Sequence, residues 1–272
     1  MKLNVLISTI DSGIEKINNI LLPIRADLEY IISHQYTDNK YKYIPKELKR
    51  PDVFISQIFG IGLTKSRNNA IKHANGDVCI ISDDDVKYTN EYFDIVKKIY
   101  ENNKVDIACF KIFTGENQKE YKKYPNHEID LKDLHIYSPS SIELTFKLNT
   151  IEEKKILFDE RFGLGSWLNG GEENIFVYDA IKANLKVRFF PFYIVQHPYE
   201  STIKSFPKYA KRRTRVTGAF DARVNGFISI PKSFFAMFKF YSELKRDKKN
   251  HFRYFLERLS GAIYILISNY KF

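Results

Sequence analysis

The sequence predicts an α/β fold built on a mainly parallel sheet. Short apolar runs of strand length alternate with helical patterns through about residue 110 of the 272-residue chain. The run Val78-Cys79-Ile80-Ile81 is apolar throughout, as expected for a strand buried on both faces. A hydrophobic content of 44% with 15% aromatic residues excludes a disordered chain and allows one large core or two modest ones.

The expected elements follow from periodicity and from stop signals. A helix over residues 63–75 takes Thr64 as its N-cap and Asn75-Gly76 as its stop. The lysine- and tyrosine-rich stretch 114–137 has no clear period and predicts loops. The expected strands are residues 3–9, 28–33, 78–81, 142–148 and 187–195, and the expected helices are 14–22, 63–75 and 172–184.

Three consecutive aspartates, Asp83, Asp84 and Asp85, end the apolar run. The simplest interpretation is a solvated turn in which one Asp caps the next helix. A helix, a glycine stop and a buried strand precede them, however, and ligands of open α/β sheets gather at the carboxyl ends of strands. Three like charges at one such point favour a site for a divalent cation.

The segment "SRNNAIKHANGDVCIISDDDV" resembles the nucleotide-sugar transferases of the GT-A fold, in particular glycosyltransferase family 2. The resemblance covers about residues 3–198. It implies a GT-A-type mixed, mainly parallel sheet flanked by helices, with a C-terminal helical extension. It also makes Asp83 and Asp85 the two aspartates of the family's Asp-x-Asp motif.

A second segment, "WLNGGEENIF" from residue 167 to 176, is similar to the acceptor-side motif of β-1,4-galactosyltransferases and to the Glu-Asp motif of family 2. The resemblance implies acceptor binding by Trp167, Gly170 and Gly171 and makes Glu173, or its neighbour Glu172, the catalytic base. A carboxylate there can take the proton that an acceptor hydroxyl loses as it attacks. An ordinary acidic first turn of a helix is the alternative.

The resemblance also implies a metal site and a nucleotide site. His197, after the last predicted strand, would coordinate Mn²⁺ or Mg²⁺ together with Asp85 and Asp83, and imidazole favours Mn²⁺. A satisfied turn histidine is the alternative. The nucleotide-binding residues would be Thr9, His34, Arg67, Asp83 and Asp84. Family members usually carry an aspartate where this chain has His34-Gln35, and Arg67 could equally be a solvated helix residue.

The two cysteines, Cys79 and Cys109, both lie in apolar strand-like runs. We expect buried free thiols in a reducing compartment. The first ten residues predict a strand and no cleavable signal peptide, and no segment has the ~20 consecutive apolar residues of a membrane span.

Charge is concentrated at the C-terminal end. Residues 201–272 hold 16 Lys and Arg against 4 Asp and Glu, a net charge of +12, whereas the whole chain has a net charge of +10. The bases alternate with Phe, Tyr, Leu and Ile in a helical pattern. A surface for anionic membrane lipids, a nucleic-acid surface and a solvated helical face packed on the catalytic domain are the three interpretations, of which nucleic acid is the least favoured.

The sequence therefore predicts a catalytic domain over residues 1–200 and a basic helical extension over 201–272. The donor-binding half would be about 1–110 and the acceptor half 111–200. We expect inverting, metal-dependent transfer from a nucleoside-diphosphate sugar, most readily a UDP-sugar, to a glycan or lipid-linked acceptor. The setting would be bacterial surface polysaccharide or glycolipid synthesis, at the cytoplasmic side. A metal-dependent nucleotidyltransferase and a non-catalytic binding protein for nucleotide sugars or nucleic acid remain alternatives.

Overall fold

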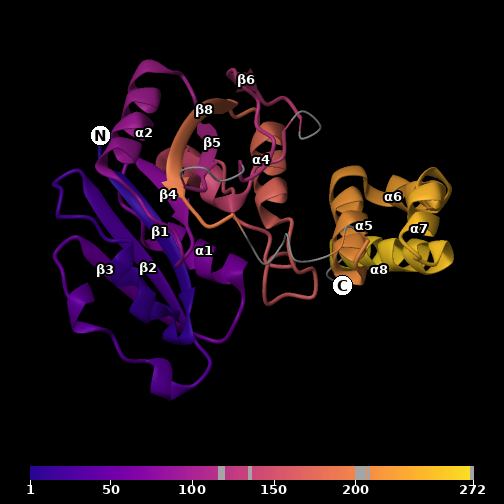
Figure 1. Ribbon diagram of the computed structural model, residues 1–272, viewed down its shortest axis with the longest axis horizontal. Helices are drawn as coiled ribbons and strands as arrows, with labels where there is room; N and C mark the ends of the chain where they lie inside the picture. The colour runs from indigo at the N-terminus through magenta and orange to yellow at the C-terminus, as the bar shows by residue number, and fades with distance from the viewer. Residues whose placement is uncertain (116–119, 134–136, 200–206, 208, 270–272) are drawn as a thin grey trace. The chain divides into compact units, whose positions relative to one another are not determined.

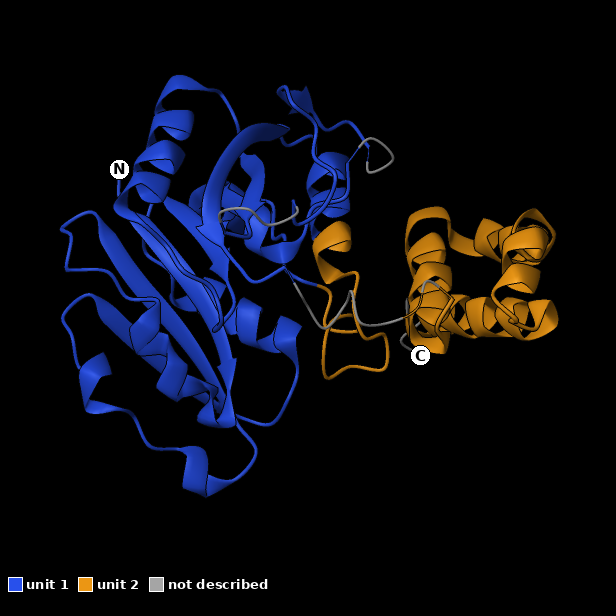
Figure 2. Cartoon of the chain, viewed as in Figure 1, with its two compact units in different colours: residues 1–158, 176–199 blue, residues 159–175, 200–272 orange. Residues whose placement is uncertain are grey.

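The computed structural model describes residues 1–115, 120–133, 137–199, 207 and 209–269. The chain forms two compact units, coloured separately in Figure 2. Unit 1 comprises residues 1–158 and 176–199, and unit 2 comprises 159–175 and 200–272. The predicted domain boundary at residue 200 stays a prediction, because a compact unit is not the same as an independently folding domain.

Unit 1 is built on an eight-stranded sheet with the order β3-β2-β1-β4-β7-β5-β8-β6 (Figure 1). Strands β1, β2, β3 and β4 pair in parallel, as do β5 and β8, whereas β7 and β6 pair antiparallel with their neighbours. The strands are β1 Leu3–Ile10, β2 Leu28–Tyr36, β3 Val53–Phe59, β4 Val78–Ser82, β5 Ile107–Phe113, β6 Ile129–Asp130, β7 Leu144–Lys147 and β8 Val187–Gln196. This mixed, mainly parallel sheet confirms the predicted GT-A-type α/β fold.

Both faces of the sheet are covered, so its central strands are apolar on both sides. On β4, Val78 and Ile80 belong to one core, which also contains apolar residues of η1 and α2. The alternate residues Cys79 and Ile81 belong to the opposite core, with residues of α1, α3 and α4. The helical segments of unit 1 are η1 Asp11–Asn19, η2 Asn39–Tyr41, η3 Lys46–Leu48, α1 Leu63–His73, α2 Asn90–Asn102, η4 Ser141–Glu143, α3 Leu148–Glu153 and most of α4 Glu172–Lys182.

Several local predictions need correction. The helix expected at 14–22 is the 3₁₀ segment η1, and Thr64 does not cap α1. The N-cap is Gly62, whose φ of 138° is readily adopted only by glycine. The N-cap therefore makes no side-chain hydrogen bond to the first turn of the helix. The strand expected at 142–148 is replaced at its start by η4, because Ser140 and Glu143 form a capping box.

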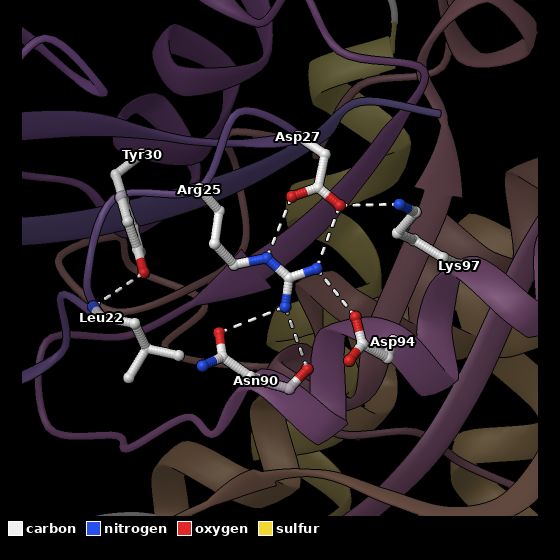
Figure 3. A network of polar contacts seen from close by, with 7 residues as sticks. All are labelled: Leu22, Arg25, Asp27, Tyr30, Asn90, Asp94 and Lys97. Carbon is white, nitrogen blue, oxygen red and sulfur yellow. Dashed lines mark hydrogen bonds and ion pairs between the residues drawn. The ribbon is translucent and has the colours of Figure 1, made fainter.

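A charged network ties the segment before β2 to helix α2 (Figure 3). The Arg25 guanidinium donates to both carboxylate oxygens of Asp27 at 3.0 Å and to Asp94 at 2.8 Å. Lys97 donates to the same Asp27 carboxylate at 2.7 Å. These contacts hold the segment before β2 against α2.

Unit 2 combines the segment 159–175 with four C-terminal helices: α5 Lys211–Asn225, α6 Ser229–Lys239, α7 Tyr241–Arg246 and α8 His251–Asn269. The short η5 Gly226–Ile228 joins α5 to α6. Helices α5 and α8 approach closely where each carries a glycine. A Cβ on Gly218 would lie 1.9 Å from the carbonyl oxygen of Arg258, and one on Gly261 would lie 2.0 Å from that of Arg215.

Cys79 and Cys109 are free and buried, as predicted, and burial raises the pKa of both thiols. None of the helices in the described part of the chain has the length and apolar character needed to cross a bilayer. The stretch 114–137, predicted as loops, contains the short strand β6. Its residues 116–119 and 134–136 lie outside the described residues, as do 200–206, 208 and 270–272 of the C-terminal region.

Candidate active site

The carboxyl ends of β1 and β4 are neighbours in the sheet, with Ile7 opposite Ser82. The residues that follow therefore meet, and the Thr9 hydroxyl donates to Asp84 Oδ2 at 2.6 Å. Gly13 packs against this pair so closely that a Cβ would lie 2.4 Å from both Asp84 Oδ2 and Thr9 Oγ1. Position 13, near the start of η1, therefore has no room for a side chain.

Asp83 is held by a different element. Its Oδ1 accepts a 3.0 Å hydrogen bond from Arg67 on α1, and the Arg67 side chain is 1% exposed. The guanidinium also lies over the ring of Phe158, with its carbon 5.5 Å from the ring centroid. Arg67 is therefore no solvated helix arginine: it is buried and fixes the first aspartate of the triplet.

Asp85 lies against His197. Backbone hydrogen bonds of 2.9 Å in both directions between Lys87 and Gln196 join the segment after β4 to the end of β8. They bring His197 Nε2 to 3.4 Å from Asp85 Oδ1. The other ring nitrogen, Nδ1, lies 2.6 Å from the Pro198 carbonyl oxygen and donates to it. Two of the three predicted metal ligands, Asp85 and His197, are thus brought together by a β-bridge between distant segments, whereas Asp83 bonds to Arg67 and its role as a ligand stays a prediction.

The three aspartates have different electrostatic surroundings. Burial raises the pKa of Asp84, against the opposing effect of its bond from Thr9. The hydrogen bond from His197 lowers the pKa of Asp85. Burial acts to lower the pKa of His197, but the hydrogen bond to Asp85 and the Pro198 carbonyl outweigh it and raise that pKa. Both shifts favour an ionised Asp85 carboxylate beside a protonated His197 imidazole.

This pair fits a divalent cation in the chemistry of its donors. With Nδ1 donating to a carbonyl, the imidazole directs Nε2 toward Asp85, which is the orientation of many metal-ligating histidines. A cation would take the place of the proton on Nε2. Among the described residues, no three His, Cys, Asp or Glu side chains group closely enough to hold a metal by themselves. A ligand such as a diphosphate would have to supply the remaining donors.

The predicted nucleotide residue His34 has a fixed tautomer. The Gln57 amide nitrogen donates to its Nδ1 at 3.1 Å and also to the Lys42 carbonyl, so Nδ1 accepts. Nε2 then carries the proton and donates to the Asp11 carbonyl at 3.0 Å. Burial lowers the pKa of His34, which favours this neutral form. Both ring nitrogens of His34 already form hydrogen bonds within the protein. Contact between His34 and a nucleotide base stays a prediction.

The residues predicted to bind the acceptor belong to unit 2. Gly170 and Gly171 have φ of 136° and 85°, which only glycine adopts readily. A Cβ on Gly171 would lie 3.0 Å from Val216 of α5. The half-exposed Trp167 ring contacts Arg215 of α5, whose guanidinium carbon is 4.1 Å from the ring centroid, and Tyr264 of α8, whose ring centroid is 4.8 Å away. The C-terminal helices therefore support the acceptor-side motif.

Glu172 and Glu173 begin helix α4, as the sequence predicts, and both are buried. Glu173 Oε1 accepts a 3.1 Å hydrogen bond from Asn174. The helix dipole favours carboxylates at this end. The choice between the two as catalytic base stays a prediction.

Unit 1 brings together Thr9, Arg67, the aspartate triplet and His197, while Trp167, Gly170, Gly171 and the two glutamates are grouped in unit 2. The sequence pattern alone did not indicate Gly13, Asp11 or Gln57 as parts of the site. Asp11 has a φ of 50°, and its Oδ1 accepts from the Thr37 backbone at 2.7 Å, which links the ends of β1 and β2. The run Asp11-Ser12-Gly13 directly after a buried strand was the available signal.

Fold and site together define a GT-A-type α/β protein with a carboxylate-rich, histidine-containing site at the carboxyl ends of its strands. The family model described as "Glycosyl transferase family 2" matches residues 24–163, just over half of the chain. The chain belongs to this family. No curated protein sequence matches it significantly.

Among solved structures, the chain is similar to S. aureus TarS. TarS 1-349 aligns with a TM-score of 0.60 at 16% identity, over 82% of this chain and 65% of TarS 1-349. TarS 1-349 in complex with UDP-GlcNAc gives the same TM-score and identity over 82% of this chain and 66% of that one. The complex with UDP has a TM-score of 0.54 at 16% identity, over 85% and 69%. The chain spans slightly less than two thirds of the first of these, and the likeness establishes the fold.

Proposed function

We propose that this protein transfers a sugar, with inversion, from a nucleoside-diphosphate sugar to a hydroxyl of a glycan or lipid-linked acceptor in bacterial surface polysaccharide or glycolipid synthesis. The observation that carries the proposal is the meeting of Asp85 and His197 beside Asp84 and Asp83 at the strand ends. Family membership supports it. The complexes of TarS with UDP-GlcNAc and UDP support a UDP-sugar as donor.

Asp85 and His197 would hold Mn²⁺ or Mg²⁺, with imidazole favouring Mn²⁺. When bound, such an ion neutralises the charge that develops on a nucleoside-diphosphate leaving group. Arg67 keeps the Asp83 carboxylate in place, and Thr9 does the same for Asp84. Both contacts order the acidic segment before a ligand arrives.

Glu173, or Glu172, would accept the proton of the attacking hydroxyl. Trp167 would contact the acceptor through the part of its ring that Arg215 and Tyr264 leave exposed. A lipid-linked acceptor would place the enzyme at a membrane surface, and the basic C-terminal region is the candidate for that attachment.

The donor is tested by thermal shift with a panel of nucleotide sugars, each with and without Mn²⁺. A ligand that binds only the folded protein raises the melting temperature by mass action, so we expect a shift that needs both donor and metal. Product analysis with the effective donor then detects transfer. A shift with nucleoside triphosphates alone, followed by nucleotidyl transfer, would identify a nucleotidyltransferase and contradict the proposal.

Asp85→Asn tests the metal ligand. We expect the metal-dependent thermal shift to disappear and turnover to fall about hundredfold or more, since metal-assisted charge stabilisation is worth several kcal/mol. Asp130→Asn is the matched control, because Asp130 is an exposed aspartate of the same unit that pairs with Arg188. Full activity of the unmodified protein in EDTA would contradict metal dependence.

A further inference from the structure

Helix α6 presents its three phenylalanines to solvent. Phe234, Phe235 and Phe238 are 45%, 67% and 60% exposed. The buried positions of the helix are Ser229, Ser233, Ala236 and Met237. Three of these four side chains are small, whereas a helix usually turns most of its large apolar side chains to the core. Packing of unit 2 therefore does not account for the three phenylalanines.

The exposed rings form a continuous stripe. At 3.6 residues per turn, Phe234 and Phe238 lie one above the other, and Phe235 lies beside them. Phe234 contacts the rings of both neighbours, with centroids 6.0 Å and 5.2 Å away, and that of Phe255 on α8 at 5.8 Å. Ile230 and Tyr241, both exposed, extend the stripe. We call Ile230, Phe234, Phe235, Phe238 and Tyr241 the α6 apolar face.

The segment that carries the α6 apolar face is strongly basic. Residues 227–256 contain seven Lys and Arg against two Asp and Glu. Lys232 and Lys239 lie on α6 itself, and both are exposed. Long basic side chains beside exposed aromatic rings are the pattern of a helix that lies in the interface of a bilayer with anionic headgroups.

We infer that the α6 apolar face is a docking surface for an anionic lipid bilayer, into which Phe234, Phe235 and Phe238 insert while the surrounding lysines and arginines contact the headgroups. This surface goes beyond the proposed transfer reaction, because binding to lipid requires neither donor nor metal. Helix α6 has 11 residues and would lie along the membrane surface without crossing it.

The same charge argues against two other occupants. A second copy of the chain docked through this face would bring two surfaces together that each carry an excess of five positive charges within residues 227–256. Nucleic acid would use the lysines and arginines, but it offers no apolar phase for a stripe that includes an isoleucine. An anionic bilayer offers acyl chains for the apolar side chains and negatively charged headgroups for the lysines and arginines.

The test is cosedimentation of the full chain with vesicles of phosphatidylcholine alone and with 30% phosphatidylglycerol. We expect binding to the anionic vesicles only, weakened as salt rises. The triple variant Phe234→Ser/Phe235→Ser/Phe238→Ser should bind at least about tenfold more weakly, since each ring loses its apolar burial. Phe59→Ser on β3 is the matched control, because Phe59 is 73% exposed and should leave binding unchanged.

Absence of vesicle binding by the unmodified chain would overturn the inference. So would equal binding by the triple variant and Phe59→Ser, which would leave charge as the only contribution. A concentration-dependent dimer in solution that the triple variant abolishes would assign the α6 apolar face to a second copy and overturn the inference as well.

Insertion itself has a spectroscopic readout. Phe235→Cys can be labelled with an environment-sensitive dye while Cys79 and Cys109 stay unlabelled, because both are 0% exposed. We expect a blue shift on anionic vesicles and quenching by spin-labelled acyl chains, and neither effect for a dye at Phe59→Cys. A dye at position 235 that stays solvent-like on bound vesicles would contradict insertion. Circular dichroism of each variant checks that the fold is retained.

Discussion

Asp83, Asp84 and Asp85 are adjacent in the chain but contact three different elements. Arg67 of α1 binds the first, Thr9 of β1 binds the second, and His197 after β8 lies against the third. Three like charges close together would repel one another, and a separate partner for each reduces that repulsion. The partners also differ in kind, so the three positions are expected to respond differently to substitution.

Gly13→Ala should damage the site from outside the triplet. The new Cβ would lie 2.4 Å from Asp84 Oδ2 and from Thr9 Oγ1, so at least one of them must move. We expect donor binding to weaken by about tenfold or more and the free energy of unfolding to fall by about 1–3 kcal/mol from overpacking. Isothermal titration and chemical denaturation measure the two effects. Ser12→Ala, at the exposed neighbour, is the control, and wild-type affinity in Gly13→Ala would show that Asp84 is not needed in this position.

Glu173→Gln should separate chemistry from binding. The amide keeps the size of the side chain but cannot accept the proton, so kcat should fall by about 10²–10⁴ while the donor KM changes little. Steady-state kinetics of Glu173→Gln and Glu172→Gln, side by side, provide the measurement. If only Glu172→Gln shows the loss, the base is Glu172.

That His197 lies beside the aspartate triplet could be predicted, because residue type and order are visible in the sequence, whereas the roles of these residues stay predictions. The contacts that hold them could not, since the bridge between Lys87 and Gln196 joins positions more than a hundred residues apart. The partners of His34 illustrate the same limit: its tautomer depends on Gln57, which lies on β3, a strand that was not predicted from the sequence.

At the scale of elements, the sheet was predictable where apolar runs are long and uniform. The parallel strands β1, β2, β4 and β8 lie within a few residues of their predicted ranges. The region around β7 was not, because a local capping box competes with strand formation at 141–143. The short strand β6 pairs only two residues with β8 and leaves almost no periodicity to detect.

The Arg25–Asp27–Lys97 network should give stability a dependence on acid pH. The hydrogen bond from Arg25, followed by that from Lys97, lowers the pKa of Asp27 below its ordinary value of 3.8. Above pH 3.8 the stabilisation is complete. As pH falls below 3.8, the unfolded chain binds the proton first, so stability declines until pH has passed the lowered pKa of the folded state.

Asp27→Asn should therefore flatten the acid limb of the unfolding free energy, measured by urea denaturation between pH 2 and 7. The exposed Glu101→Gln is the control, and equal acid limbs for Asp27→Asn and the unmodified protein would exclude this contribution.

The crossing of α5 and α8 depends on two glycines. Gly218→Ala would place a Cβ 1.9 Å from a backbone carbonyl oxygen of α8, which cannot move without displacing the helix. Overpacking of this kind costs typically about 1–3 kcal/mol. We expect a lower melting temperature and faster proteolysis within residues 209–269. Thr217→Ala, on the exposed side of α5, should leave both unchanged. Unchanged stability in Gly218→Ala would mean that α5 and α8 can move apart to accommodate the new Cβ at little cost in free energy.

At the scale of the whole molecule, the chain does not divide cleanly at one point in the sequence. Residues 159–175 carry the acceptor-side motif, yet they form a compact unit with helices that begin at Lys211. Periodicity and charge indicated a change near residue 200, but they contain no information about which earlier segment the helices cover. Long-range packing of this kind is decided by shape complementarity between distant segments.

A chain truncated after residue 199 should therefore lose more than a basic tail. Phe162, Leu168 and Ile175 form a buried apolar cluster with residues of α5 and α8, and truncation would expose all three side chains. We expect the truncated protein to aggregate or to show protease sensitivity confined to 159–175, while residues 1–158 keep their protection. Limited proteolysis with mass spectrometry provides the measurement. The full-length triple variant of the α6 apolar face is the control, because it removes the exposed phenylalanines and leaves this cluster intact. A monomeric truncated protein with a fully protected segment 159–175 would show that the acceptor-side motif folds without the C-terminal helices.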